Sequence, residues 1–220
     1  KRFLDKSLSK AIIFDFDGTL VDSQSLIYEC FEEITRIIAP SRIETAKNII
    51  IGPQLRESVK VILGDKLLEK VDIFIEKFID LHDKNVVKKC YPFPMANEVL
   101  DVLFQKKISM AIATNKRTFP TISLIEHFGW SKYFTFIECS DSKEKNRNKI
   151  AMINEIVQEP SFKYSYYIGD TLADGLSAQA NNLPFIRANY GYGKKDEWFN
   201  VNIYKSINSI DELLVSNIYE

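Results

Sequence analysis

Two aspartates separated by one residue, Asp15 and Asp17, end the apolar run in the stretch AIIFDFDGTLVDS (residues 11–23). Burying carboxylates beside isoleucine and phenylalanine costs free energy unless a positive charge compensates them. Residues i and i+2 of a strand point to the same side, so the two carboxylates can converge on one point. Gly18 follows them, and a glycine lets the backbone turn tightly and approach a ligand. The spacing predicts a site for a ligand or a reacting group.

Two later stretches place polar side chains after apolar runs in the same way. IATNK supplies Thr114, Asn115 and Lys116, and YIGDTLAD supplies Asp170 and Asp174. Clustered carboxylates repel one another unless a divalent cation lies among them. Oxygen ligands without histidine or cysteine suit Mg²⁺, while a hydroxyl and a lysine suit phosphate oxygens. Together these residues predict metal-assisted phosphoryl chemistry.

The elements that must position these residues alternate along the chain. Apolar runs typical of buried strands occupy residues 11–16, 108–115, 133–140, 164–170 and 183–188, and helical patterns occupy 118–129, 149–157 and 171–181. This alternation predicts an α/β fold, a doubly wound parallel sheet with helices on both faces. Such sheets bind ligands beyond the carboxyl ends of their strands, which is where the polar residues fall. A closing helix is expected at 206–217.

The pattern of the sequence changes from apolar strands to amphipathic helices between the first and second expected strands. Residues 25–38 and 67–84 are amphipathic helical patterns with mixed charges, and a Gly52-Pro53 turn lies between them. Residues 90–94 contain two prolines and are interpreted as a linker. We therefore expect a small helical domain of residues 22–91, inserted into a core of residues 1–21 and 92–220.

Composition excludes several classes of protein. The 29 lysines and arginines nearly balance 30 acids, for a net charge of −1, which argues against a nucleic-acid-binding face or a basic membrane-binding face. No apolar run is long enough to span a bilayer, and the N-terminal stretch lacks the apolar core of a signal peptide. The three cysteines, Cys30, Cys90 and Cys139, are expected to be free thiols in a reducing cytoplasm. A monomer or a weak homodimer is expected.

Four motifs make a more specific resemblance. FDFDGTLVDS, ATN, the lysine of NKIAMI and GDTLAD resemble, in order, the four motifs of the haloacid dehalogenase-like (HAD) superfamily, from Ala11 to about Ile186. The helical insert resembles the small cap domain of its first subclass, and the core would be the Rossmann-like HAD core. IGPQLRES and NYGYG resemble stretches of its phosphoglycolate phosphatase group.

The resemblance implies roles for the two aspartates of the first motif. Asp15 would be the nucleophile that attacks phosphorus and forms an aspartyl-phosphate, so that one difficult displacement becomes two. Asp17 would be the general acid that protonates the leaving oxygen and then the base that activates water. The two carboxyl groups therefore need opposite protonation states, which different surroundings must enforce.

The resemblance also implies a magnesium site and a phosphate site. Asp15, Asp170 and the backbone carbonyl of Asp17 would hold Mg²⁺, with Asp174 orienting water on the ion. The alternative for Asp174 is an ordinary carboxylate at a helix N-terminus. Thr114 would bind the phosphoryl group with support from Asn115, and the backbone at Gly18 would approach it.

The lysine of the third motif has several candidates, since the segment offers Lys143, Lys145, Arg147 and Lys149. Lys149 is chosen because it opens the helical pattern KIAMINEI, as the family lysine does. It would neutralise the nucleophile and the phosphate together. The other members of such a charge run are usually solvated.

Two further basic side chains, Arg56 and Lys116, allow two interpretations each. Arg56, just after the Gly52-Pro53 turn, either grips a distal anion of the substrate, which a planar guanidinium suits, or is an exposed helix arginine. Lys116 lies either near the phosphate or in solvent. His82 and the second histidine, His127, are interpreted as structural, because nothing in the sequence pairs them with an acid or a nucleophile.

These observations lead to one main function and two alternatives. The main hypothesis is a Mg²⁺-dependent hydrolase of a small phosphorylated metabolite, with phosphoglycolate as the first guess and a nucleoside monophosphate, pyrophosphate or a sugar phosphate also compatible. A β-phosphoglucomutase-type phosphomutase would share the core motifs, because the cap chooses the acceptor. A non-catalytic module would have lost Asp15, Asp17 or Asp170, and all three are present. The dehalogenase branch lacks the second aspartate.

Overall fold

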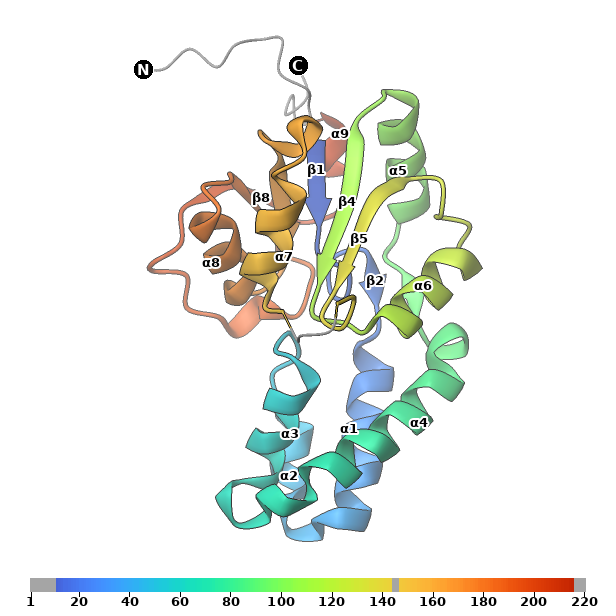
Figure 1. Cartoon of the computed structure of the whole chain (residues 1–220), viewed down its shortest axis with the longest axis vertical. Coiled ribbons are helices and arrows are strands. Elements are labelled where there is room, and N and C mark those ends of the chain that lie inside the picture. Colours follow the sequence, from blue (N-terminus) through green and yellow to red (C-terminus); the bar gives the residue numbers. More distant parts are fainter. Residues whose placement is uncertain (1–10, 144–146, 216–220) are drawn as a thin grey trace.

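The centre of the molecule is a six-stranded sheet in the order β5-β4-β1-β6-β7-β8, with every pair parallel. A computed structural model describes residues 11–143 and 147–215 (Figure 1). The strands are β1 (Ala11–Phe14), β2 (Val21–Asp22), β3 (Tyr91–Pro92), β4 (Ser109–Thr114), β5 (Phe134–Cys139), β6 (Tyr166–Gly169), β7 (Phe185–Ala188) and β8 (Ile203–Ile207). The helices are α1 (Gln24–Ile38), α2 (Ile43–Lys47), α3 (Leu55–Leu63), α4 (Val71–Lys89), α5 (Ala96–Gln105), α6 (Thr118–His127), α7 (Lys149–Ile156), α8 (Leu172–Ala180) and α9 (Glu212–Val215).

Strand β1 is apolar throughout because both of its faces are buried. Ile12 and Phe14 belong to one hydrophobic cluster, together with residues of α5, α6 and α9. Ala11 and Ile13 belong to a second cluster, together with residues of α7 and α8. Since a strand covered on both sides needs no polar face, the sequence runs without alternation. The predicted α/β fold with helices on both faces of a parallel sheet is confirmed.

Helices α1 to α4 form a separate layer beyond the carboxyl ends of the strands, and the β1 arrow points toward it (Figure 1). The chain enters this layer through β2 and leaves through β3, which pair with each other in antiparallel register. Buried aromatic side chains of α1 and α4, such as Phe31, Phe74 and Phe78, pack these two helices together. We propose that residues 22–91 are the cap domain and that residues 1–21 and 92–220 are the core; parts of that core lie outside the described residues.

The C-terminal region differs from the sequence-based expectation. A helix was expected over 206–217, but Ser206 and Ile207 end strand β8, and the described helix α9 covers Glu212–Val215. Strand β8 is an edge strand whose burial alternates, with Tyr204 exposed and Ile207 buried. A short half-exposed strand that is stabilised by pairing with β7 has no continuous apolar run to reveal it.

Two smaller expectations concern membranes and cysteines. Among the described residues, helices are too short or too polar to cross a membrane. Cys30, Cys90 and Cys139 are free and buried, as expected.

Candidate active site

The polar residues predicted from the strand ends meet at one edge of the sheet. Asp15 directly follows β1, and its backbone N–H donates to the carbonyl of Ile168 in β6 at 2.8 Å, which extends the strand pairing. Thr114 ends β4, and Asp170 follows β6. All three side chains are buried. Because these strands are neighbours in the sheet, their carboxyl ends bring the side chains together.

Lys149 joins this group as the first residue of α7. Its Nζ lies 2.9 Å from Asp15 Oδ1 and 2.5 Å from Asp174 Oδ1. Asn148 caps the helix by accepting a hydrogen bond from the backbone N–H of Ala151 at 2.9 Å, which fixes where α7 begins. Burial alone would lower the pKa of Lys149, but Asp15 and Asp174 raise it above its usual range. The lysine is therefore held as a cation beside the predicted nucleophile.

Asp174 uses both of its oxygens within the protein. Oδ1 contacts Lys149, and Oδ2 accepts from the Thr171 side chain at 2.7 Å and from the backbone N–H of Thr171 and Asp170 at 2.9 and 3.2 Å. With Thr171 it forms a capping box at the N-terminus of α8. These contacts show that Asp174 positions Lys149 and the turn carrying Asp170. Asp174 is therefore a carboxylate at a helix N-terminus, and it also lies beside the acids that are predicted to hold the ion.

The carboxylates are arranged so that a hard cation would fit among them. Ligand oxygens of Asp15, Asp170 and Asp174 lie within 4.8 Å of one another, and all three residues are buried. Burial, followed by the charge of Asp174, raises the pKa of Asp15 to about 7 and that of Asp170 well above its usual range. Lys149 contributes one positive charge against three acids. An oxygen-only, acid-rich and under-compensated site of this kind suits Mg²⁺.

Two glycines let the backbone approach Asp170. Gly18 has a φ of +83°, and a Cβ at this position would overlap the Asp170 carboxylate. Gly191, in the NYGYG stretch, lies just as close, so a Cβ there would overlap Asp170 as well. The carboxylate also accepts from Thr19 Oγ1 at 3.1 Å and from the Tyr192 backbone N–H at 2.6 Å. These contacts hold Asp170 toward the neighbouring acids.

Asp17 lies apart from the three buried acids and has different partners. Lys116 Nζ donates to its two oxygens at 3.0 and 3.1 Å, and Ser23 Oγ donates to Oδ1 at 2.7 Å. The Lys116 side chain is only 5% exposed, whereas that of Asp17 is 17% exposed. Of the two interpretations of Lys116, the structure therefore favours the one that places it in the site, through Asp17.

Thr114 and Asn115 have different surroundings. Thr114 Oγ1 accepts from the backbone N–H of Lys116 at 3.1 Å, which holds the hydroxyl at the strand end. Asn115 Nδ2 donates across to the cap, to the carbonyl of Gly52 at 2.8 Å. The structure thus brings Thr114 to the reacting edge and gives Asn115 a contact with the cap loop.

Comparison with known proteins agrees with this geometry. The sequence model of a family described as haloacid dehalogenase-like hydrolase matches residues 12–188. The chain belongs to the haloacid dehalogenase-like hydrolases. The matched region contains β1 from Ile12 onward, the cap helices and the strands β4 to β7 of the large sheet.

Individual relatives of this hydrolase are moderately similar. It is 28% identical to phosphoglycolate phosphatase of Agrobacterium fabrum over 197 residues, which cover 85% of this chain and 83% of that protein. Phosphoglycolate phosphatase of Rhodobacter capsulatus is also 28% identical, over 85% of this chain and 87% of that protein. The crystal structure of a predicted phosphatase from Clostridium acetobutylicum has a TM-score of 0.82 at 25% identity, with 97% of this chain and 100% of that one covered.

A cavity of about 90 Å³ separates the cap of this hydrolase from its reacting residues. The core contributes Asp15, Asp17, Thr114, Asn115, Lys116, Arg117, Pro120 and Lys149, and the cap side contributes Ile27, Phe31, Ile51, Gly52, Pro53, Leu55, Ser58, Phe78 and His82. The cavity therefore lies where the resemblance predicts substrate to bind, between the strand ends and the helical layer.

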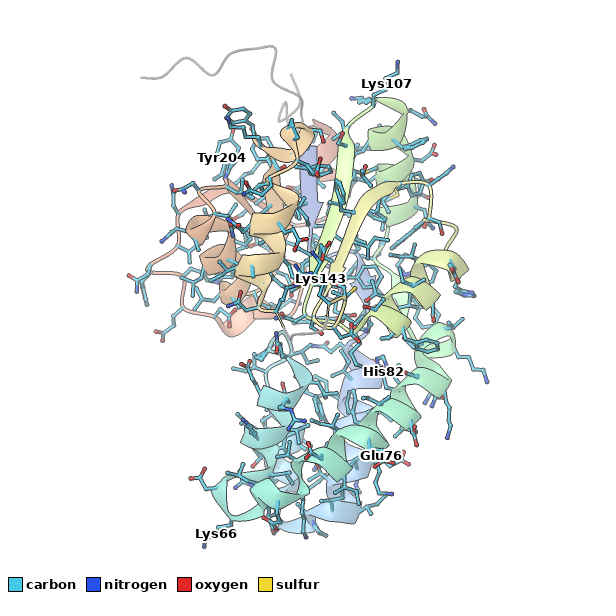
Figure 2. All side chains as sticks on the ribbon, viewed as in Figure 1. Lys66, Glu76, His82, Lys107, Lys143 and Tyr204 are labelled. Atoms are coloured by element: carbon cyan, nitrogen blue, oxygen red, sulfur yellow. The ribbon has the colours of Figure 1, made fainter. Side chains whose placement is uncertain are left out.

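His82 is a cavity residue that sequence reasoning missed. It lies on α4 close to the junction of the helical layer with the sheet (Figure 2). Its Nδ1 is 3.1 Å from Asp83 Oδ1, so the histidine does have an acid partner. The signal was its spacing, since Phe74, Phe78 and His82 recur every four residues on one buried face of α4. His127 instead contacts the ring of Phe128.

Arg56 is the predicted site residue that the structure does not bring to the cavity. Its Nη2 lies 2.7 Å from Asp72 Oδ1, in a pair whose side chains are 47% and 84% exposed. The residue lies on the outer side of α3, while its neighbour Leu55 lines the cavity. The interpretation as an exposed helix arginine thus agrees with the structure, and a grip on a distal anion does not.

A substitution tests this placement of Arg56. We expect Arg56→Ala to leave kcat/KM within about twofold of the parent for anionic and neutral substrates, because an exposed ion pair contributes about 0–1 kcal/mol and touches no substrate. Steady-state phosphate release measures the effect. A rise in KM confined to substrates with a second anion would restore the original hypothesis.

Proposed function

We propose that this hydrolase is a Mg²⁺-dependent phosphatase that cleaves small phosphomonoesters through an aspartyl-phosphate on Asp15. The observation that carries the proposal is the position of Asp15. It lines the cavity, follows the central strand and has Lys149 Nζ 2.9 Å from Oδ1. The relatives named phosphoglycolate phosphatase catalyse a reaction of the same class, which supports the proposal.

The first step forms the covalent intermediate. A carboxylate oxygen of Asp15 attacks phosphorus, a P–O bond to Asp15 forms, and the P–O bond to the leaving group breaks. The charge of Lys149 opposes the rise in the pKa of Asp15 and so favours the ionised, attacking form of that carboxyl group. Lys149 also balances charge on the phosphoryl oxygens, which the Thr114 hydroxyl contacts as well. Mg²⁺, held by Asp15, Asp170 and the Asp17 carbonyl, would neutralise negative charge on the phosphoryl group.

Asp17 handles the protons in both steps. Its carboxyl group donates a proton to the leaving oxygen as the first P–O bond breaks, and the resulting carboxylate takes a proton from the water that attacks the aspartyl-phosphate. The second attack releases phosphate and regenerates Asp15. Lys116 and Ser23 hold the Asp17 side chain in one orientation through their hydrogen bonds. The mechanism requires the two acids to carry opposite protonation states when substrate is bound, and the two carboxyl groups have different partners.

The cap keeps bulk water away while these steps proceed. Asn115 donates to the carbonyl of Gly52 at 2.8 Å, and Gln54 Nε2 donates to the carbonyl of Arg147 at 2.8 Å. Both bonds join the cap loop to core loops that border the cavity, so they must break when the cap opens to exchange substrate and product. In this proposal Asn115 supports the site by closing it.

Several further properties remain predictions that accompany the proposed function. The substrate is a small phosphorylated metabolite, the enzyme is a cytoplasmic monomer or weak homodimer, and nucleic acids and membranes are not partners. A phosphomutase would use the same Asp15 chemistry with a sugar hydroxyl as acceptor. The assay below separates it from a phosphatase.

Phosphate release from a panel of monoesters tests the proposed function. We expect release in Mg²⁺ and loss of release in EDTA, because the buried acids need the cation before phosphate can approach them. Rapid quenching with a radiolabelled substrate should trap label on the protein, in a form that hydroxylamine removes, as for an acyl phosphate. Interconversion of sugar phosphate isomers without phosphate release would overturn hydrolysis in favour of the mutase.

A further inference from the structure

The cavity has two ends of different chemistry. At the core end, Asp15, Asp17, Thr114 and Lys149 provide the reacting and phosphate-binding groups. The cap end is formed largely by five hydrocarbon side chains, those of Ile27, Phe31, Ile51, Leu55 and Phe78. A phosphate monoester bound with its phosphorus at Asp15 directs its leaving group toward the cap. The leaving group is therefore what meets this apolar wall.

The apolar wall includes a row of rings. The centroids of Phe31 and Phe78 are 4.7 Å apart, and Phe78 stacks on the ring of His82 at 5.6 Å with an interplanar angle of 14°. These rings come from α1 and α4 and are buried. Flat aromatic faces bind hydrocarbon groups and other rings with favourable dispersion and little ordering cost. A wall of aromatic and aliphatic side chains suits a branched alkyl or aryl group.

Each lysine and arginine that lines the cavity already has an acid partner. Lys149 pairs with Asp15, Lys116 pairs with Asp17 at 3.0 Å, and Arg117 pairs with Asp83. A carboxylate on the leaving group would have to compete with these acids for a counter-charge.

Among the described residues, two further basic groups of the cap, His82 and Arg56, do not supply a free cation either. Burial, followed by the charge of Lys116, lowers the pKa of His82 below its usual range, which favours the neutral ring. Arg56 points outward and pairs with Asp72. Moving a carboxylate from water against hydrocarbon without a counter-ion is strongly unfavourable. A second anion is thus disfavoured at the cap end.

We propose that the preferred substrates are phosphate monoesters of uncharged, apolar alcohols, with the leaving group against Phe31, Phe78 and the aliphatic side chains of the cap. This inference rests on the proposed phosphatase function and specifies its leaving group. It differs from the phosphoglycolate expected at first, because that leaving group carries a carboxylate. The relatives named phosphoglycolate phosphatase are 28% identical to this chain, and in this proposal the cap lining of this chain selects its own leaving group.

A matched pair of substrates tests the inference directly. Isobutyl phosphate and phosphoglycolate have the same number of heavy atoms and a similar branched shape, and they differ in the charge of the leaving group. We expect kcat/KM for isobutyl phosphate to exceed that for phosphoglycolate by about tenfold or more, with benzyl phosphate also preferred. A preference for phosphoglycolate would overturn the inference.

A pair of lysine substitutions on α3 adds a test of the location. Leu55→Lys places a cation at the apolar end, and Val61→Lys places the same charge on the same helix, at a side chain that is 58% exposed and outside the cavity lining. We expect Leu55→Lys to shift the ratio of the two kcat/KM values toward phosphoglycolate by about tenfold, and Val61→Lys to leave the ratio unchanged. An unchanged ratio in a folded Leu55→Lys variant would place the leaving group elsewhere.

The two hypotheses fail in different ways. If neither ester of the pair, nor any other monoester, releases phosphate in Mg²⁺, the proposed phosphatase function is wrong. If monoesters are hydrolysed and the charged leaving group is preferred, the function stands and the inference about the cap is wrong. The unmodified protein decides between these outcomes, so the test does not depend on a variant that folds.

Discussion

Replacing Asp15 with asparagine is expected to reduce phosphate release by about 10⁴-fold or more, in the range seen when an enzyme loses its nucleophile. An amide cannot form the aspartyl-phosphate, and the variant also removes one carboxylate from the group that would hold Mg²⁺. The other acids at this edge are engaged elsewhere among the described residues. Asp170 and Asp174 are bound by backbone N–H groups and Lys149. Asp17 is held by Lys116 and Ser23. Single-turnover assays with excess enzyme measure the residual rate.

Stability measurements separate this chemical effect from unfolding. Burial and then the charge of Asp174 raise the pKa of Asp15 to about 7, so the folded protein does not favour the charged form. A neutral side chain of the same shape should therefore not lower the unfolding midpoint in magnesium-free buffer. Asp72→Asn, which alters an 84% exposed carboxylate, is the matched control and should retain activity. Activity of Asp15→Asn within tenfold of the parent would refute the proposed nucleophile.

Replacing Lys149 with methionine is the second large effect that we expect. The substitution leaves the buried carboxylates of Asp15 and Asp174 without their shared cation. Breaking a buried ion pair by removing one partner costs about 3–5 kcal/mol, and we expect the free energy of unfolding in EDTA to fall by about that amount. Loss of a preorganised charge beside the phosphoryl group should also lower kcat by about 10²–10³-fold. Urea unfolding and steady-state assays measure the two effects.

Lys143 provides the matched control for Lys149. Both lysines lie in the segment that the sequence offered for the third motif, but Lys143 is half exposed and pairs with Glu155. Lys143→Met should change the free energy of unfolding by no more than about 1 kcal/mol and kcat by no more than a few fold, since exposed ion pairs contribute little. Equal effects at the two positions would mean that the catalytic lysine is misassigned. Lys145, the other lysine of the run, lies outside the described residues.

The site residues at the strand ends could be predicted because two physical constraints produce recognisable sequence patterns. A central parallel strand is buried on both faces, so Ala11–Phe14 is a continuous apolar run, and the aspartates after it stand out. Ligands of parallel sheets gather at the carboxyl edge, so Thr114 and Asp170 could be placed beside Asp15 without coordinates. The resemblance to a known family added roles to residues already singled out by this argument.

Side-chain partners could not be predicted, because they depend on how helices pack. The sequence offered four basic residues for the third motif. The burial of Lys149 between two acids follows from the packing of α7 against α8, which carries Asp174, beside the end of β1, which directly precedes Asp15. Arg56 and Leu55 are neighbours in sequence, yet the packing of α3 on α4 turns Leu55 into the cavity and Arg56 toward Asp72. Local pattern does not determine the rotation of a short helix about its axis.

The chain by itself therefore determined the fold, the reacting edge and the acids that cluster there, because these follow from burial periodicity and strand direction. Only the tertiary structure decided what surrounds the leaving group, since residues from α1, α3 and α4 that are distant in sequence meet there. It also revealed His82 on the cavity wall and the edge strand β8, which are defined by contacts with other elements. In a sequence, the apolar residues of the cap cannot be distinguished from residues of an ordinary hydrophobic interior. Only their position opposite Asp15 shows that they line the cavity.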